Sequence, residues 1–471
     1  MPLLRDSEEE GAYKRLLETT FGDLLEEEVT EKAVPGGVLA VVYDKNRMEA
    51  SSYAAVLSDL ASEPVFLVEF YLTDDKPPVR WTDDGVMEIR VSSAVAVGAK
   101  PAEDEASKPE EWKPVRAAFR YVTQRPWTRF PIKCKTRILN PLLPCIAGGR
   151  NKAMGAVAYD ILNSDLETKG IGLRIRTPET CPSARKQEVP LWIKRFGGHG
   201  VVKVPFLNAG QGVYTILSKA ELDAFMADKH YYSSYIVQSL IGHSAWSSRQ
   251  RDGTFYHTGT VPDKHNRIFV ADLRMMVSAT KDGYRPLAAY ARRAAEPLEA
   301  DTDGKSSWSM LGTNLSKLQG DLEWTSETDR LLLMDRKDFN TLGLGLDDLI
   351  DGFVQTVLSM VAIDKMCIRL VDKTTGDFNY RLFHSLCGDS VLFDEIMDNR
   401  TANRTALGVE AMERGVSVDM AVEMIRHDAP LEASTAEITT VGGSASGGGE
   451  GEGMSGPIPV AEPKAAEGES S

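Results

Sequence analysis

Two lysines near the middle of the chain stand in segments that could hold a phosphate group. Lys203 lies in the β-branched run VVKV, and the glycine-rich stretch NAGQG (208–212) follows before the next apolar run, VYTI. Glycines let backbone N–H groups approach an anion, and a nearby lysine adds positive charge. Lys152 lies in GGRNK at the expected start of a helix, where the backbone also favours anions. Taken alone, each segment is more typical of an ordinary turn than of a phosphate site, and neither is a Walker A loop.

A third element carries acid and base together. In ADLRMMV (271–277), Asp272 and Arg274 share one face of an expected strand, because side chains alternate along strands. Arg292 and Arg293 end the partner strand in YARRA (290–294). Guanidinium groups bind carboxylates or phosphates through two parallel hydrogen bonds. The alternative interpretation of this element is a structural Asp–Arg ion pair.

Composition narrows the class of protein. The 471 residues include 54 Lys and Arg against 69 Asp and Glu, a net charge of −15, which argues against a nucleic-acid-binding protein. No run of about 18 apolar residues predicts a membrane span, and the N-terminal residues do not resemble a secretory signal. The five cysteines include no CxxC, so neither structural zinc nor a disulfide framework is expected. We expect a soluble, cytoplasmic protein without nucleic-acid or membrane partners.

The elements that must position these residues alternate between strand and helix patterns. A strand (36–45), a helix (49–62) and a strand (64–75) predict a small α/β unit near the N-terminus. Further on, a helix is expected from 148 to 163, strands at 235–242 and 267–294, and an amphipathic helix over 345–363. The segment 366–383 is expected to form a hairpin. Beyond about 430 the chain is rich in Gly, Ser and Glu and is expected to be a disordered tail.

The order of these motifs resembles the ATP-grasp superfamily, and within it the carboxylate–amine ligases, such as those that add glutamate to a ribosomal protein. The resemblance covers roughly residues 140–390 and implies an α/β (α+β) fold in which two subdomains clasp a nucleotide. It implies four regions: a pre-ATP-grasp domain (1–140), a central subdomain with the glycine loop (141–235), a C-terminal subdomain (236–430) and the tail (431–471). YIVQSLIG would be the hinge strand that binds adenine, and LGTNLSK a loop carrying a functional asparagine.

The resemblance also implies roles for individual residues. The nucleotide would be held by Lys152, Lys203, Asn208, Gly210, Gln211, Gly212, Gln238, Ser239, Leu240 and Asp272. The residues that act on the transferring phosphoryl group would be Arg274, Arg292, Arg293 and Asn314. The family usually has an acidic residue where this chain has Ser239.

The metal site departs further from the family pattern. The family holds magnesium with an Asp on one strand of the last hairpin and a Glu-x-Asn on the next, but here those positions fall at Arg369 and at 382–384. The candidate substitutes are Asp372, His384 and Asp389, and Asp372 is also typical of a turn residue. ATP with Mg²⁺ (or Mn²⁺) is the cofactor pair that the resemblance implies.

The expected activity is ATP-dependent joining of a small-molecule carboxylate to an amine through an acyl phosphate. Two alternatives stay open: an ATP-binding scaffold that has lost catalysis, and an ATP-grasp phosphotransferase. The carboxylate, the amine and the oligomeric state, including a homodimer, are not fixed by the sequence.

Overall fold

The computed structural model groups the chain into a compact unit, Met1–Ala429, and a second unit, Pro430–Ser471. The residues that it describes are 17–22, 24, 26–44, 47–71, 76–98, 111–121, 129–207, 210, 212–229, 232, 234–242, 248, 256–257, 259–280, 282–299, 307–319, 323–334, 336–389, 392–393 and 396. The predicted tail (431–471) lies outside these residues, and the predicted domain boundaries stay predictions.

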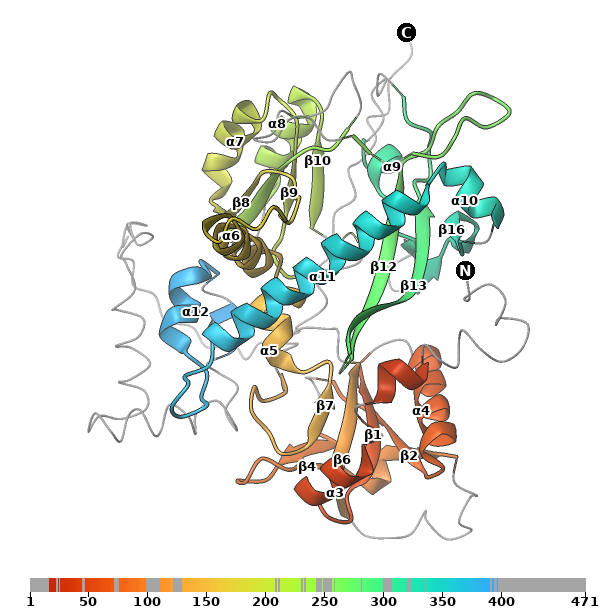
Figure 1. The fold of residues 1–471 in the computed structure, drawn as a ribbon, viewed down its shortest axis with the longest axis vertical. Coiled ribbons are helices and arrows are strands. Elements are labelled where there is room, and N and C mark those ends of the chain that lie inside the picture. The colour runs from red at the N-terminus through yellow and green to blue at the C-terminus, as the bar shows by residue number, and fades with distance from the viewer. Residues whose placement is uncertain are drawn as a thin grey trace, which may run out of the picture. The chain divides into compact units, whose positions relative to one another are not determined.

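The N-terminal part of the described chain is built on a seven-stranded sheet (Figure 1). Strand β1 pairs in parallel with β2 and β6, and helix α4 connects β1 to β2, as the strand–helix–strand pattern predicts. Separate groups of buried side chains cover the two faces of the sheet. The elements of this part are α3 (Glu27–Ala33), β1 (Val38–Tyr43), α4 (Arg47–Ala61), β2 (Val65–Glu69), β3 (Val79–Trp81), β4 (Met87–Arg90), β5 (Ala94–Val97), β6 (Trp112–Tyr121) and β7 (Arg137–Leu139).

A second, antiparallel sheet carries the predicted glycine loop. Its strand order is β10-β9-β11-β8, with the loop between β9 and β10. Helix α8 begins with the predicted capping box, in which Ser218 and Glu221 satisfy each other's backbone N–H groups. The elements are α5 (Leu142–Pro144), α6 (Lys152–Thr168), β8 (Thr180–Ala184), α7 (Val189–Arg195), β9 (Gly200–Lys203), β10 (Val213–Ile216), α8 (Lys219–Ala227) and β11 (Tyr235–Ser239).

The third sheet contains the predicted arginine-bearing strands. Strands β12 and β13 form a long antiparallel hairpin, and β16 extends it on the β13 side. The elements are β12 (Ala271–Thr280), β13 (Gly283–Arg293), α9 (Trp308–Leu311), β14 (Ser316–Gln319), β15 (Glu323–Ser326), β16 (Leu331–Leu332), α10 (Arg336–Leu342), α11 (Leu346–Arg369) and α12 (Tyr380–Leu386).

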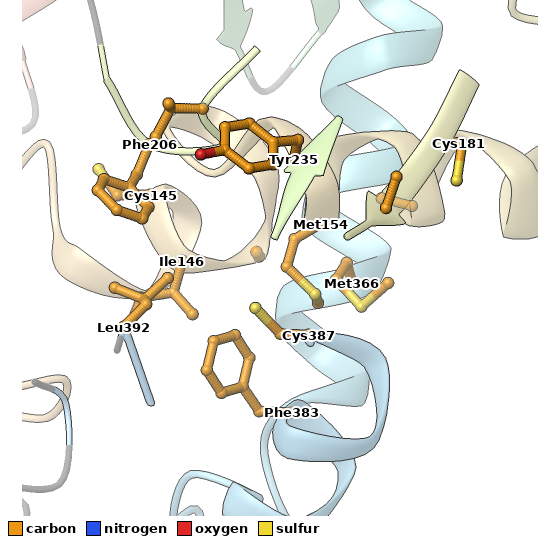
Figure 2. Packing of buried hydrophobic residues seen from close by; sticks show 14 of the residues in the cluster. Cys145, Ile146, Met154, Cys181, Phe206, Tyr235, Met366, Phe383, Cys387 and Leu392 are labelled. Carbon is orange, nitrogen blue, oxygen red and sulfur yellow. The ribbon is translucent and has the colours of Figure 1, made fainter. Parts of the chain in front are cut away.

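Helix α11 is a long amphipathic helix that contacts α6 and β12 (Figure 1). Its C-terminal half buries Ala362, Ile363 and Met366 in the core of the glycine-loop sheet. Figure 2 shows this core, with Met366 near Met154 and Cys387. The helix therefore continues through Arg369, because its buried side chains recur at helical spacing.

The predicted hairpin at 366–383 is wrong. Residues 366–369 are the end of α11, and α12 begins at Tyr380 with the Asn379 side chain accepting from the Leu382 N–H at 2.9 Å. Only an isolated bridge between Val371 and Phe378 joins the two sides of the turn among the described residues. The periodicity of the short apolar runs MCIRLV and NYRLF fits a strand and a helix equally well. Both runs contribute to helices in the structure, because their apolar side chains pack against the core at helical spacing.

The mixed α+β class expected from the sequence is confirmed by the arrangement of sheets and helices. In the described part of the chain, no helix combines the length and the apolar character that crossing a membrane requires.

Candidate functional site

The chain enters helix α6 through a strained turn that places Lys152 at the first helical position. The π-helical segment Cys145–Gly149 contains Gly148 with a φ of 148°, where a Cβ atom would lie 2.9 Å from the Cα of Gly155. Asn151 then caps the helix, fully buried, with its side-chain oxygen accepting from two N–H groups of the first turn. The first N–H groups of α6 are taken up, since the Lys152 N–H donates to the Pro205 carbonyl at 2.9 Å and the next two donate to Asn151, so only the dipole of this helix start favours an anion beside Lys152.

Three positive side chains meet at this helix start. Burial is the largest cause that lowers the pKa of Lys152 to about 8, and the charges of Lys203 and Arg150 lower it further. Burial also lowers the pKa of Lys203 to about 8. Within the described part of the chain, neither lysine has a carboxylate partner; the Lys152 Nζ donates to the backbone oxygens of Pro205 and Leu207. An anion bound here would relieve both the burial cost and the mutual repulsion.

Lys203 also belongs to a row of polar side chains that crosses the sheet. Its Nζ donates to the Gln238 Oε1 at 2.5 Å, and the Gln238 Nε2 donates to the Thr180 Oγ1 at 2.8 Å. The three residues come from β9, β11 and β8, which are neighbours in the sheet. The row fixes the direction of the lysine side chain on one face of the sheet.

The glycine loop begins directly after Lys203. Gly210 and Gly212 have φ values of 78° and 61°, a region that favours glycine, and the Gly212 carbonyl accepts from the Val204 N–H at 2.8 Å. A Cβ atom on Gly210 would lie 2.9 Å from the Trp308 Cζ2 and 3.5 Å from the Asn314 Nδ2. The predicted ligands Asn208 and Gln211 lie outside the described residues. The loop therefore passes close to Asn314, which the sequence also places in the site.

The predicted arginine cluster forms around Asp272. The Asp272 Oδ2 accepts from Arg274 at 3.0 Å, from Arg292 at 2.9 Å and from the Thr313 hydroxyl at 2.9 Å. Burial raises the pKa of this carboxyl, and Arg274 and Thr313 oppose that shift. Arg293 lies on the other face of β13, over the Phe269 ring and 3.8 Å from Asp329. Arg292, and not Arg293, therefore joins Arg274 at the Asp272 carboxylate.

The lysine cluster and the arginine cluster are linked through residues 313 and 314. Thr313 bonds Asp272, and its neighbour Asn314 lies against Gly210. The structure thus brings Lys152 and Lys203 together, and separately Arg274 and Arg292, with one short segment between the two groups.

The hinge strand offers fewer free groups than expected. The Leu240 N–H donates to the Ser248 Oγ at 2.7 Å, and the Leu240 carbonyl accepts from the Ser248 N–H at 3.0 Å. The Ser239 N–H donates to the Glu179 carbonyl at 2.9 Å. The Ser239 hydroxyl is buried without a hydrogen-bond partner among the described residues. A purine that bound to the backbone of Leu240 would have to replace Ser248.

The three metal candidates serve other purposes in the structure. Asp372 accepts from the backbone N–H groups of Thr374 and Thr375 in a turn, and Asp389 accepts from the Leu392 N–H at 3.0 Å. The His384 ring packs edge-on against Phe393.

No group of three or more His, Cys, Asp or Glu side chains is placed to share a metal ion in the parts of the chain that the structure describes. Two carboxylates that cap backbone groups and a ring packed on Phe393 do not fit a protein-held Mg²⁺ site. The expectation of a magnesium ion therefore has no ligand set among these residues.

Sequence reasoning assigned no role to two residues at the site. Arg150 stands in GGRNK, the motif from which only Lys152 was singled out, and its charge reaches the lysine. Thr313 precedes Asn314 and orients Asp272. Arg150 could have been predicted as a site residue from its position two residues before the start of α6. No local sequence pattern predicts the role of Thr313.

Comparison with known proteins gives remote structural likenesses, including the two below. No family model matches the chain, and no curated protein matches it by sequence. The chain is similar to D-alanyl-alanine synthetase A from Vibrio cholerae, with 10% identity, a TM-score of 0.41, and coverage of 70% of this chain and 81% of the other. It is also similar to a RimK domain protein ATP-grasp from Sphaerobacter thermophilus, with 13% identity, a TM-score of 0.29, and coverage of 69% and 98%.

With TM-scores of only 0.41 and 0.29, neither likeness carries an argument about this chain. Because both likenesses are remote, the function proposed below rests on the side chains of this chain.

Proposed function

We propose that this chain binds ATP through its lysine cluster and uses it to join a carboxylate to an amine. The observation that carries the proposal is the meeting of Lys152, Lys203 and Arg150 beside the glycine loop, without a carboxylate partner for either lysine among the described residues. A structural role alone would favour pairing the two lysines with carboxylates, because an unpaired cation that is partly buried is costly. A polyphosphate supplies the missing negative charge.

The proposed reaction has two steps. A substrate carboxylate oxygen attacks the γ-phosphorus of ATP, the bond to the β-phosphate oxygen breaks, and an acyl phosphate and ADP form. The amine nitrogen then attacks the acyl carbon, and phosphate leaves as the amide forms and the nitrogen loses a proton. Both steps build negative charge on oxygens, which preorganised cations stabilise.

Each group of site residues has a separate role in the proposed reaction. Lys152 and Lys203 hold the phosphates of the nucleotide, and the glycine loop excludes water that would hydrolyse the acyl phosphate. Arg274 and Arg292 stabilise the transferring phosphoryl group, and Asp272 holds both guanidinium groups in place. Asn314 lies against the glycine loop at Gly210, and its proposed role is to act on the phosphates beneath that loop.

The direct test is incubation with ATP, Mg²⁺ and pools of carboxylates and amines. ADP and phosphate that form only when both co-substrates are present support the ligase. ADP with a stable phosphorylated product indicates a phosphotransferase instead. Binding of ATP without turnover supports the scaffold, which the missing metal ligands among the described residues favour. Absence of any ATP binding rejects the proposed site itself.

Nucleotide binding is expected to weaken as the pH rises through about 8. Lys152 and Lys203 each have a pKa of about 8, so they are cationic at pH 7 and largely neutral at pH 9. Only the cationic form attracts phosphate, so for each lysine that must be charged the affinity falls about tenfold by pH 9. Titration calorimetry from pH 6.5 to 9.5 measures this, together with the uptake of protons on binding. The Lys203→Arg variant, which keeps its charge, should show a shallower decline; an affinity that stays constant over this range contradicts the assignment.

A further inference from the structure

Two side chains of the glycine-loop part, Glu221 on α8 and Thr215 on β10, bond Ser307 at the start of the short helix α9. The Glu221 Oε1 accepts from the Ser307 Oγ at 2.7 Å and from the Ser307 N–H at 3.1 Å. Ser307 is fully buried, and its hydroxyl also lies 2.5 Å from the Thr215 Oγ1 on β10. Hydrogen bonds to a charged acceptor in a buried place are among the stronger ones in proteins. The start of α9 is therefore held firmly against β10 and α8.

The other oxygen of Glu221 has a separate task. The Oε2 accepts from the N–H groups of Leu217 and Ser218 and so closes the capping box of α8. Capping needs only this oxygen and the Ser218 hydroxyl. The bridge to Ser307 is thus additional to what the stability of helix α8 requires.

Trp308 of α9 and the two residues that follow Gly312 lie between the two charged clusters. The Trp308 ring lies at Gly210 and Gly312, so the indole packs on the glycine loop. Directly after the helix, Thr313 bonds Asp272 and Asn314 lies at Gly210. A displacement of α9 would therefore move the surface that supports the loop and the residue that orients Asp272 together.

We propose that Glu221 and Ser307 are positioning residues for the nucleotide site. They hold α9 so that Trp308 supports the glycine loop over the phosphates and Thr313 orients the Asp272–arginine cluster. The proposal rests on the proposed function, since it names what positions that same site. A glycine-rich loop loses much conformational entropy when it becomes ordered around a ligand. A fixed surface against the loop restricts it before binding, so less of this entropy is lost when the nucleotide binds.

Two alanine variants separate positioning from helix stability. Ser307→Ala removes the hydroxyl bonds to Glu221 and Thr215, keeps the backbone N–H bond to Glu221 and leaves the capping box of α8 intact. Ser218→Ala removes the hydroxyl of the cap and leaves the bonds between Glu221 and Ser307 intact. We expect Ser307→Ala to raise the Kd for ATP about tenfold, the loss of one hydrogen bond to a charged group. Ser218→Ala should lower the melting temperature at least as much as Ser307→Ala and leave the Kd within twofold.

The outcomes distinguish this inference from the proposed function. Equal ATP affinity of Ser307→Ala and the unaltered chain overturns the positioning role and leaves the ATP site standing. A parallel loss of affinity in Ser218→Ala also overturns it, because affinity would then follow helix stability. Failure of the unaltered chain to bind ATP overturns both proposals.

A second variant keeps the test decisive where Ser307→Ala fails to fold. Thr215→Val removes the other hydroxyl that meets Ser307 and preserves the shape of the side chain. We expect the Kd to rise in the same direction, with the KM for ATP raised and kcat lowered together, because α9 supports both the glycine loop and the Asp272–arginine cluster. An unchanged Kd and KM in a folded Thr215→Val protein contradicts the positioning role.

Discussion

Replacement of Lys203 by alanine is expected to lower ATP turnover by about 10²–10³-fold, to the limit of detection. Neither lysine of the site, Lys152 or Lys203, has a carboxylate partner among the described residues. The bond from the Lys203 Nζ to Gln238 fixes the direction of the lysine side chain on one face of the sheet. Loss of this cation leaves Lys152 and Arg150 to balance the triphosphate. Turnover and the equilibrium Kd for ATP, both measured at pH 7, report the effect.

The fold should tolerate the Lys203→Ala change. Burial lowers the pKa of Lys203, which means that the surroundings disfavour its charge in the free protein. The melting temperature should therefore stay the same or rise. Lys219→Ala is the matched control, because that lysine is exposed and pairs only with Asp223 across one helical turn. Near-normal turnover in Lys203→Ala, or an equal loss in Lys219→Ala, would show that Lys203 is not the phosphate-binding lysine.

Local sequence signals predicted the elements of the site well. The β-branched run and the glycines around Lys203 predicted strand, loop and strand, and the structure has β9 and β10 there. Ser218 and Glu221 predicted a capping box three residues apart, which is present. Alternation along β12 placed Asp272 and Arg274 on one face, where they form an ion pair. In each case the pattern within a few residues determines the local structure.

Contacts between distant residues could not be read in the same way. The register of β12 against β13 pairs Asp272 with Arg292, and only that register shows that Arg293 faces away. The bond that Glu221 accepts outside the capping box comes from Ser307, which is 86 residues further along the chain. No local pattern encodes such a pair, because it forms only when separate elements pack.

The predicted hairpin after α11 failed for a related reason. The run MCIRLV is apolar enough for a strand, but Met366 packs into the core with Ala362 and Ile363 at helical spacing. The helix consequently occupies the place where the ATP-grasp resemblance implied metal-binding strands. The family pattern thus predicted the strands and the loop around Lys203 better than the segment in which it placed the metal ligands.

The second large effect is expected from Arg292→Ala, which should lower the rate of phosphoryl transfer by about 10²–10³-fold. Arg292 bonds Asp272 and is mostly shielded, with 15% of its side chain exposed, so its charge acts in a medium that screens it weakly. If it stabilises charge that develops during transfer, kcat should fall while the KM for ATP changes little. Single-turnover formation of ADP in the presence of the carboxylate measures this step.

The neighbouring arginine provides the control. Arg293 follows Arg292 directly but faces the other side of β13, towards Phe269 and Asp329. Arg293→Ala should therefore change kcat by less than about threefold, the loss of one weak surface ion pair. Arg292→Lys, which keeps the charge but loses the planar pair of donors, should lie between the two. An equal loss of kcat in Arg292→Ala and Arg293→Ala would mean that the arginines stabilise the sheet and do not act in the reaction. A role at the Asp272 cluster requires a side chain on the face of β13 that Arg292 occupies, so it predicts unequal losses.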